Sequence, residues 1–307
     1  MFVVSHGASA EPAAKPLPAE LASYKVLRNL DYAGTDNPRQ KLDLLLPQDQ
    51  TDTPRPVIVY IHGGAWLGGD KRHASNHLSR LLKVTGSPRY AFASIGYRLS
   101  GEAIWPAQIH DCKAGIRWIR ANAEKYNLDP DRIAVWGPSA GGHLVAMLGT
   151  SGDDKAMEGD VGPHTTTSSR VTCVANFFGP TDFLQMGGSH NDADSPESRL
   201  VGGAIQEHVE EVATANPITY VSKDDPPFLT VHGTQDRLVP YSQGVLLHEA
   251  LERSDLDSTL ITVNEGGHGR GFGEPVFKLL SQFFAHHLHG EEVPWEDRTI
   301  QATVKSN

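Results

Sequence analysis

The sequence predicts an α/β protein built on one mostly parallel β-sheet of about eight strands, with helices on both faces. Short runs rich in β-branched and aromatic residues alternate with longer segments of helical periodicity, which is the pattern of strands joined by crossover helices. Several of these short runs are apolar almost throughout, as expected for strands buried on both faces. The chain has no internal repeat and no long Pro/Gly linker, so nothing divides this sheet in two.

Each element is expected on its own local pattern. Two runs near the start, 24–30 and 42–46, are expected as antiparallel strands at the sheet edge. Apolar residues at helical spacing predict helices over 109–119 and 276–288. The runs with the composition of buried strands are 57–61, 91–95, 133–136, 171–178, 228–231 and 260–263.

The domain organisation follows from where this pattern stops. We expect a single domain over 21–290, with insertions near 152–169 and 183–216 that are rich in Gly, Ser, Asp and Glu and are candidates to cover a site. Residues 1–20 are expected to be a flexible lead-in, and their Ala-Ser-Ala resembles a signal-peptidase site without the charged region that precedes one. Residues 291–307 form an unassigned C-terminal tail.

Charge and composition exclude several classes of partner. The 307 residues carry 27 Lys and Arg against 37 Asp and Glu, a net charge of −10. Binding to nucleic acid or to an anionic membrane surface depends on clustered cations, so neither partner is expected. No apolar run reaches the roughly 20 residues of a membrane-spanning helix. The two cysteines, Cys112 and Cys173, are compatible with two buried thiols or with one disulfide.

The most informative motif is Gly-Pro-Ser-Ala-Gly at 137–141. It directly follows a predicted strand and directly precedes a helical pattern, which is the context of a nucleophile elbow. On such a turn the backbone of the serine is strained, and side chains two residues away on either side would collide. Ser139 is therefore the candidate nucleophile, at a helix N-terminus whose amides favour developing negative charge.

A serine nucleophile needs a base and an acid, which in this architecture follow it in the order acid, then histidine. Asp236 comes just after the predicted strand 228–231, and His268 lies in a glycine-rich loop after the strand 260–263. Asp182, after the preceding strand, is the rival acid and is less favoured by chain order. The competing downstream histidines are expected to be surface or helix-end residues: His248, His286, His287 and His289.

An oxyanion hole needs backbone N–H groups directed at the carbonyl oxygen of the substrate. The residue after the nucleophile, Ala140, supplies one. The run His-Gly-Gly-Ala-Trp at 62–66 follows the strand 57–61, and the amides of Gly64 and Ala65 are its candidate donors. His62 is expected to brace this loop.

Together these motifs resemble the α/β-hydrolase superfamily, and within it the esterases related to hormone-sensitive lipase. The likeness extends from about residue 24 to residue 288 and is closest to the bifunctional feruloyl and acetyl-xylan esterase family. The resemblance implies Ser139, Asp236 and His268 as a catalytic triad. It also implies an oxyanion hole, with Ala65 standing where many lipase relatives carry a third glycine. The motifs are HGGAW at 62–66, GPSAGG at 137–142, FGPTD at 178–182, HGTQDRLVP at 232–240 and GGHG at 266–269.

Other signals are weaker. Trp66, Trp105 and Phe178 are candidates to line a substrate pocket, with core packing as an equal alternative. The histidines near the C-terminal helix end have no closed ligand set, and the acidic loops lack the spacing of a calcium loop, so no metal is expected. No cofactor is expected either.

The expected function is that of a serine carboxylic ester hydrolase acting on feruloyl, acetyl or similar short or aromatic esters, free or linked to plant polysaccharide. Synthetic aromatic polyesters are a further candidate substrate. The alternatives are an arylformamidase-like amidase, a prolyl-peptidase-like enzyme or a lipase on the same scaffold, or a non-catalytic binding protein that kept the fold. We expect an extracellular or periplasmic location, with the cytoplasm as the alternative; the sequence leaves the oligomeric state open.

Overall fold

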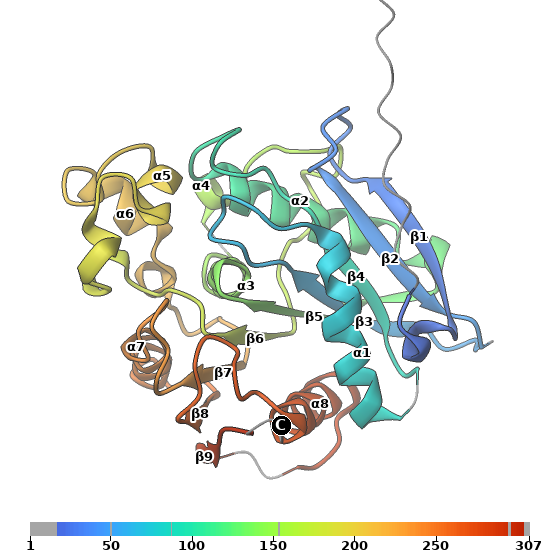
Figure 1. The fold of residues 1–307 in the computed structure, drawn as a ribbon. Coiled ribbons are helices and arrows are strands. Elements are labelled where there is room, and N and C mark those ends of the chain that lie inside the picture. Colours follow the sequence, from blue (N-terminus) through green and yellow to red (C-terminus); the bar gives the residue numbers. More distant parts are fainter. Residues whose placement is uncertain (1–16, 50, 87, 153, 294–295, 304–307) are drawn as a thin grey trace, which may run out of the picture.

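The fold is a single nine-stranded sheet covered by helices (Figure 1). It is seen in a computed structural model that describes residues 17–49, 51–86, 88–152, 154–293 and 296–303. The strands lie in the order β1-β2-β4-β3-β5-β6-β7-β8-β9. Strand β2 is antiparallel to both β1 and β4, and all other neighbours are parallel.

The elements have the following bounds. The strands are β1 Tyr24–Asp31, β2 Lys41–Pro47, β3 Arg55–Ile61, β4 Ala91–Ile95, β5 Leu128–Pro138, β6 Cys173–Phe177, β7 Phe228–Gly233, β8 Ser258–Asn264 and β9 Arg298–Gln301. The helices are α1 Ala74–Thr85, α2 Ala107–Ala121, α3 Ala140–Thr150, α4 Lys155–Glu158, α5 Pro196–Val201, α6 Val209–Ala215, α7 Ser242–Glu252 and α8 Glu274–His289. Short 3-10 helices are η1 Ala19–Leu21, η2 Lys71–His73, η3 Glu124–Tyr126, η4 Phe183–Gln185, η5 Gly188–Asn191 and η6 Pro217–Tyr220.

The central strands are apolar on both faces because helices cover both sides of the sheet. On β3, Val57, Val59 and Ile61 belong to the hydrophobic cluster that includes the apolar residues of α2, α3 and α7. Ile58 and Tyr60 point to the opposite face and belong to the cluster formed with α1 and α8. The period-2 alternation of a strand thus divides one apolar run between two cores.

The expected fold class and the expected strands are confirmed. The edge strands are antiparallel, and the helices predicted over 109–119 and 276–288 lie within α2 and α8. Two differences are local. Residues 298–301 of the unassigned tail form β9, a short strand with alternating exposure that adds to the free edge of β8. Most of the lead-in lies outside the described residues, but Ala19 and Glu20 belong to η1, where Glu20 accepts a hydrogen bond from Ser79.

The segment near 152–169, which the sequence predicts to be an insertion, is anchored by two buried cations of α2. The Lys113 ammonium donates to the carbonyl of Ser151 at 2.6 Å and lies 3.2 Å from a carboxylate oxygen of Glu158. The Arg117 guanidinium pairs with the same carboxylate and donates to the carbonyl of Val161 at 2.8 Å. The side chains of both cations are fully buried. The insertion is therefore part of the packed structure on the α2 side.

Two further expectations concern the whole chain. Cys112 and Cys173 are both buried and unpaired, which decides between the alternatives left by the sequence. Among the described residues, no helix combines the length and apolarity needed to cross a bilayer.

Candidate active site

Ser139 lies on a strained turn between β5 and α3. Its backbone has φ 56° and ψ −125°, a conformation that non-glycine residues rarely adopt. The turn is held on both sides: the Ser139 amide donates to the carbonyl of Phe177 on β6 at 2.8 Å, and the Ser139 carbonyl accepts from the amide of His143 at 2.9 Å. The strand-turn-helix context expected for a nucleophile is present.

The glycines around Ser139 are required by close backbone contacts. A Cβ atom on Gly137 would lie 2.5 Å from the carbonyl oxygen of Gly141, and one on Gly141 would lie 2.2 Å from the carbonyl oxygen of Ile61. Both distances are well below van der Waals contact, and both neighbours are backbone atoms that cannot rotate away. The collisions expected from the motif therefore occur in the fold.

His268 and Asp236 meet at the ends of β8 and β7. The Nδ1 atom of His268 is 2.8 Å from Oδ2 of Asp236. The other carboxylate oxygen of Asp236 accepts from the amides of Leu238 and Val239 at 2.8 and 3.0 Å, which fixes the orientation of the carboxylate. Asp236 leaves its second oxygen to the imidazole, so the geometry holds His268 with Nδ1 as the donor.

The pKa of Asp236 is set by two opposing effects. Burial raises it, but the neighbouring His232 imidazole and the hydrogen bonds from His268 and the Val239 amide outweigh burial and hold the pKa of Asp236 well below its ordinary value. Nε2 of His232 lies 3.6 Å from Asp236 and 2.9 Å from the carbonyl of Val239. The close contact of His232 is thus with the carbonyl, and Asp236 stays ionised beside His268.

The rival acid is occupied elsewhere. One carboxylate oxygen of Asp182 accepts from the amide of Leu184 at 3.1 Å and from the side chain of Asn216 at 3.1 Å. Its other oxygen accepts from the side chain of Gln185 at 2.6 Å. These bonds cap η4 and tie it to the segment before η6.

The loop at 62–66 lies directly beside Ser139. A Cβ atom on Gly63 would be 2.7 Å from the carbonyl oxygen of Pro138 and 3.4 Å from Cβ of Ser139. Gly64, Ala65 and Trp66 all have positive φ, which turns successive amides of the loop. His62 is buried and its ring stacks on Tyr97 at 4.2 Å, as expected for a residue that braces this loop.

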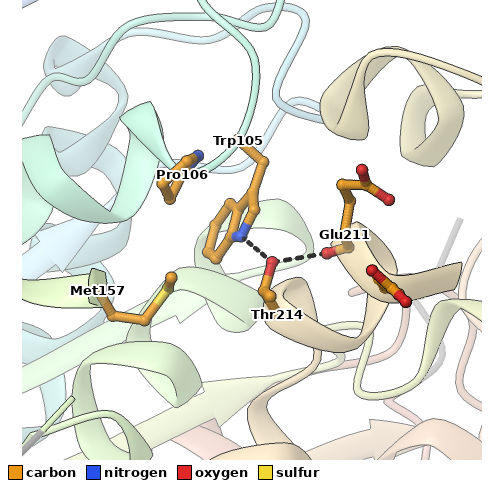
Figure 2. A pocket seen from close by; sticks show the side chains of 6 residues that line it. Trp105, Pro106, Met157, Glu211 and Thr214 are labelled. Carbon is orange, nitrogen blue, oxygen red and sulfur yellow. Dashed lines mark hydrogen bonds between the residues drawn. The ribbon is translucent and has the colours of Figure 1, made fainter. Parts of the chain in front are cut away.

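The three aromatic residues proposed for a pocket lie in different places. Phe178 contacts the imidazole of His268, with ring centroids 4.5 Å apart. Trp66 is buried against His143, which also contacts Trp105 at 5.6 Å. Trp105 lines a cavity of about 380 Å³ between α2, α4 and α6, together with Met157 and Glu211 (Figure 2). The triad candidates do not line that cavity, and the role of these aromatic residues stays a prediction.

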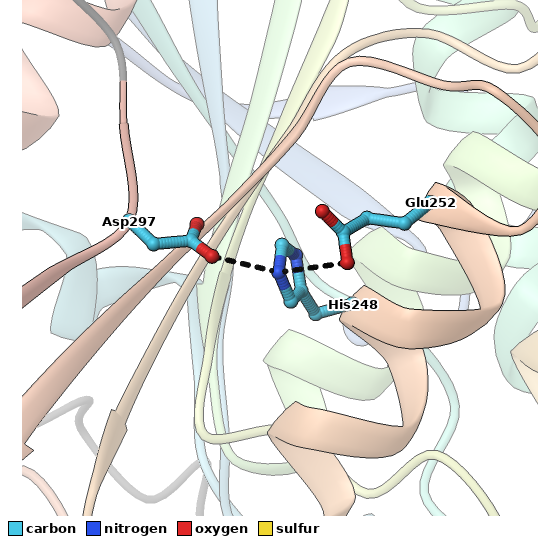
Figure 3. A group of neighbouring side chains, drawn as sticks. All are labelled: His248, Glu252 and Asp297. Carbon is cyan, nitrogen blue, oxygen red and sulfur yellow. Dashed lines mark hydrogen bonds and ion pairs between the residues drawn. The ribbon is translucent and has the colours of Figure 1, made fainter.

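His248 differs from its expected exposure. The sequence suggested a surface or helix-end residue, but only 5% of His248 is exposed because it packs between α7 and β8. Nδ1 bonds to Ser258 Oγ at 2.9 Å, and Nε2 faces Asp297 at 3.0 Å and Glu252 at 3.5 Å (Figure 3). Among the described residues, these three form the one group whose potential ligand atoms lie within 4.8 Å of one another.

Sequence reasoning missed the part played by His143. Its Nδ1 accepts a hydrogen bond from Trp66 Nε1 at 3.3 Å, so its Nε2 carries the proton and donates to the carbonyl of Ala215 at 2.6 Å. This neutral imidazole links the loop at 62–66, the helix after the nucleophile and the insertion at 183–216. Its position four residues after Ser139, one helical turn on, was the available signal.

Two solved structures are similar to this chain in sequence and in fold. A truncated carbohydrate esterase from gut microbiota is 37% identical and superposes with a TM-score of 0.83, covering 89% of this chain and 100% of that one. A bifunctional GH43-CE protein of Bacteroides eggerthii is 38% identical with a TM-score of 0.78, covering 85% of this chain and 38% of that one. Both neighbours share the α/β-hydrolase fold predicted from the motifs.

Curated relatives are longer than this chain. Esterase LipC of Mycobacterium tuberculosis is 33% identical over 77% of this chain and 58% of its own length. Across LipC, LipM and LipQ of that organism, the matched part spans between 43% and 58% of the relative. The BD-FAE family model matches residues 42–251, which include Ser139 and Asp236 and end before His268. The chain therefore belongs to the BD-FAE family of α/β-hydrolases, as its motifs predicted.

Proposed function

We propose that this protein is a serine carboxylic ester hydrolase that works through an acyl-enzyme. The observation that carries the proposal is the 2.8 Å hydrogen bond between His268 and Asp236, at the sheet edge where the strained Ser139 turn ends β5. Phe178 connects the two parts, since Ser139 bonds to the preceding residue and the Phe178 ring contacts His268.

In this mechanism His268 takes the proton of the Ser139 hydroxyl as the hydroxyl attacks the ester carbonyl. Asp236, held ionised by its hydrogen bonds, orients the imidazole and stabilises the imidazolium that forms. The amides of Gly64, Ala65 and Ala140 receive the negative charge of the carbonyl oxygen in the tetrahedral intermediate. His268 then protonates the leaving alcohol. A water molecule, deprotonated by the same imidazole, attacks the acyl-serine, and the imidazolium returns the proton to Oγ of Ser139 as the bond to the acyl group breaks and the acid is released.

For the substrate class, we propose short acyl or feruloyl esters carried by plant polysaccharide. Two structural neighbours at 37% and 38% identity are described as a carbohydrate esterase and a bifunctional GH43-CE protein, which supports a carbohydrate alcohol. The best comparison is of kcat/KM on acetylated xylan, methyl ferulate, p-nitrophenyl acetate and an aromatic polyester. Higher kcat/KM on N-formylkynurenine than on every ester would favour the amidase alternative.

The nucleophile is tested by replacing Ser139 with Ala. Hydrolysis of p-nitrophenyl acetate should fall by at least about a thousandfold with the unfolding temperature kept, because only one hydroxyl is lost. A fluorophosphonate should label the wild-type protein at Ser139 and leave the variant unlabelled. Ser189→Ala, at an exposed serine of η5, is the matched control and should retain activity. Full turnover by Ser139→Ala would refute the proposal, and a wild-type protein that resists labelling would favour the non-catalytic alternative.

A further inference from the structure

The C-terminal segment after α8 lies against the loop that carries His268. Residues 298–301 pair in parallel with β8, from Ile261 opposite Arg298 to Asn264 opposite Gln301. Both the segment and the loop lie beyond residue 251, where the match to the family model ends.

The start of the segment is fixed by Asp297. One carboxylate oxygen accepts from the backbone amide of Leu260 on β8 at 2.8 Å. The other faces Nε2 of the buried His248 at 3.0 Å (Figure 3), and the second ring nitrogen of His248 bonds to Ser258 at 2.9 Å. Asp297 therefore connects the segment to α7 through His248 and to β8 through Leu260.

The end of the segment is fixed to both sides of the His268 loop. The Ala302 amide donates to the carbonyl of Asn264 at 2.9 Å, four residues before His268. The Thr303 amide donates to the carbonyl of Gly271 at 2.8 Å, three residues after His268. The segment therefore bridges the two ends of the loop.

Gly273 of the loop lies in close contact with the Thr303 side chain. A Cβ atom on Gly273 would lie 2.1 Å from Oγ1 of Thr303, and the three nearest heavy atoms all belong to the Thr303 side chain. Gly273 has φ −86°, which other residues adopt freely, so its own backbone does not require glycine. Glycine is required at this position because the Thr303 side chain approaches so closely.

The loop is rich in glycine and is held at its start by bonds to the end of β7: the Glu265 amide donates to Thr234 Oγ1 at 2.9 Å, and the Gly266 carbonyl accepts from the Gln235 amide at 2.8 Å. Between Glu265 and Gly273 it contains five glycines, which leave the backbone more conformational freedom than other residues would. Within the loop, the Gly267 amide donates to the Arg270 carbonyl at 3.0 Å. A general base must be held within a fraction of an ångström of its working position, since misplacement by about 1 Å can cost about a hundredfold in rate.

We propose that residues 297–303 act as a strap that positions His268 for catalysis. This inference rests on the proposed function, in which His268 is the general base. In this proposal the strap acts on catalysis through the loop and not through contact with the substrate. Removing it should therefore lower kcat and leave KM nearly unchanged.

The test compares the full chain with a variant that ends at Glu296. We expect kcat for p-nitrophenyl acetate to fall at least tenfold with KM within twofold, and fluorophosphonate labelling of Ser139 to slow by a similar factor. A chain ending at Thr303 keeps every strap contact described and is the control. Asp297→Ala, in the full chain, provides a second variant should the shortened chain fail to fold, and should lower kcat in the same direction.

A double-mutant cycle separates positioning from general stability. Gly273→Ala should lower kcat in the full chain, because Cβ meets Thr303, and should have no added effect in the chain ending at Glu296. The strap proposal would be overturned if the folded chain ending at Glu296 and the Asp297→Ala variant both kept the kcat of the wild-type protein. His268→Ala distinguishes the two proposals: if it stays active the proposed function fails, whereas if it is inactive while the truncation is fully active only the strap fails.

Discussion

Asp182 and Asp236 follow the neighbouring strands β6 and β7, and their carboxylates have different hydrogen-bond partners. Asp236 receives two backbone amides on one oxygen and offers the other to His268. Asp182 uses both oxygens to cap η4 and to hold Asn216 and Gln185. An aspartate thus orients an imidazole in one loop, and another aspartate holds the backbone of η4 in the other.

Replacing Asp236 with Asn should lower kcat by on the order of a thousandfold or more, because an amide can donate to His268 and stabilise the wrong tautomer. Steady-state kinetics on p-nitrophenyl acetate measure the effect. Asp182→Asn is the matched control and should keep kcat within a few fold. Equal losses in the two variants would contradict the assignment of Asp236.

His143 makes stability depend on pH. Burial lowers the pKa of His143 from 6.5 to about 4, against the smaller opposing effect of its bond to Ala215. The unfolded chain therefore binds the proton first as the pH falls. The stabilisation is complete above about pH 6.5 and decreases as the pH drops towards 4, by up to about 3 kcal/mol for this one group.

His143→Gln should weaken that dependence, because a neutral amide can accept from Trp66 and donate to Ala215 without titrating. Urea unfolding at several pH values between 4 and 7 measures the slope of the free energy of unfolding. The slope should fall by up to about 1.4 kcal/mol per pH unit, one proton's worth. His62, His77 and His287, whose pKa values burial also lowers to about 4, should contribute to the remaining slope. An unchanged slope in the variant would show that His143 is not the titrating group.

At the scale of elements, α2 and the insertion near 152–169 are joined by charge. Lys113 and Arg117 are fully buried on α2, and Glu158, at the end of α4, is the carboxylate that both contact. Ser169 donates a further hydrogen bond to Glu158 at 2.6 Å. Removing one partner of such a group leaves an uncompensated buried charge, which is costly.

Glu158→Gln should lower the free energy of unfolding by about 3 kcal/mol or more, measured by urea denaturation. Glu249→Gln is the matched control, since Glu249 pairs with Arg253 on the exposed face of α7 and both side chains are more than half exposed. That control should cost less than about 1 kcal/mol. Similar losses in the two variants would mean that the buried group does not hold the insertion.

At the scale of the whole molecule, the sheet and its two hydrophobic clusters hold the chain together without a disulfide. Cys112 lies in the cluster of α2 and α3, and Cys173 lies in the cluster of α1 and α8, on opposite faces of the sheet. Both thiols are buried, and burial raises their pKa values.

A thiol reagent should therefore modify neither cysteine in the folded protein and both in concentrated guanidinium chloride without prior reduction. The colour released by Ellman's reagent counts the thiols. The unfolding temperature should be the same with and without dithiothreitol. A reductant-dependent unfolding temperature would indicate a disulfide.

Local sequence patterns predicted most of the architecture because the spacing of apolar residues depends on whether they form a strand or a helix. Apolar runs and helical spacing predicted eight of the nine strands and the helices α2 and α8, since burial on a sheet or helix face sets those periods. Strand β9 was missed because its alternating polar residues pair only with an exposed edge. His248 was misjudged because helical spacing does not reveal which partner covers a helix face.

The sequence by itself determined the fold class and the order of the candidate nucleophile, acid and base along the chain, because apolar runs and the glycine motifs at strand ends have local causes. The tertiary structure decided which carboxylate meets His268, since that depends on how the strand ends lie side by side. It also decided that His143 joins three segments and that Ala302 and Thr303 bond to the two ends of the His268 loop. Such contacts join residues far apart in the chain, and their distances exist only once the sheet has assembled.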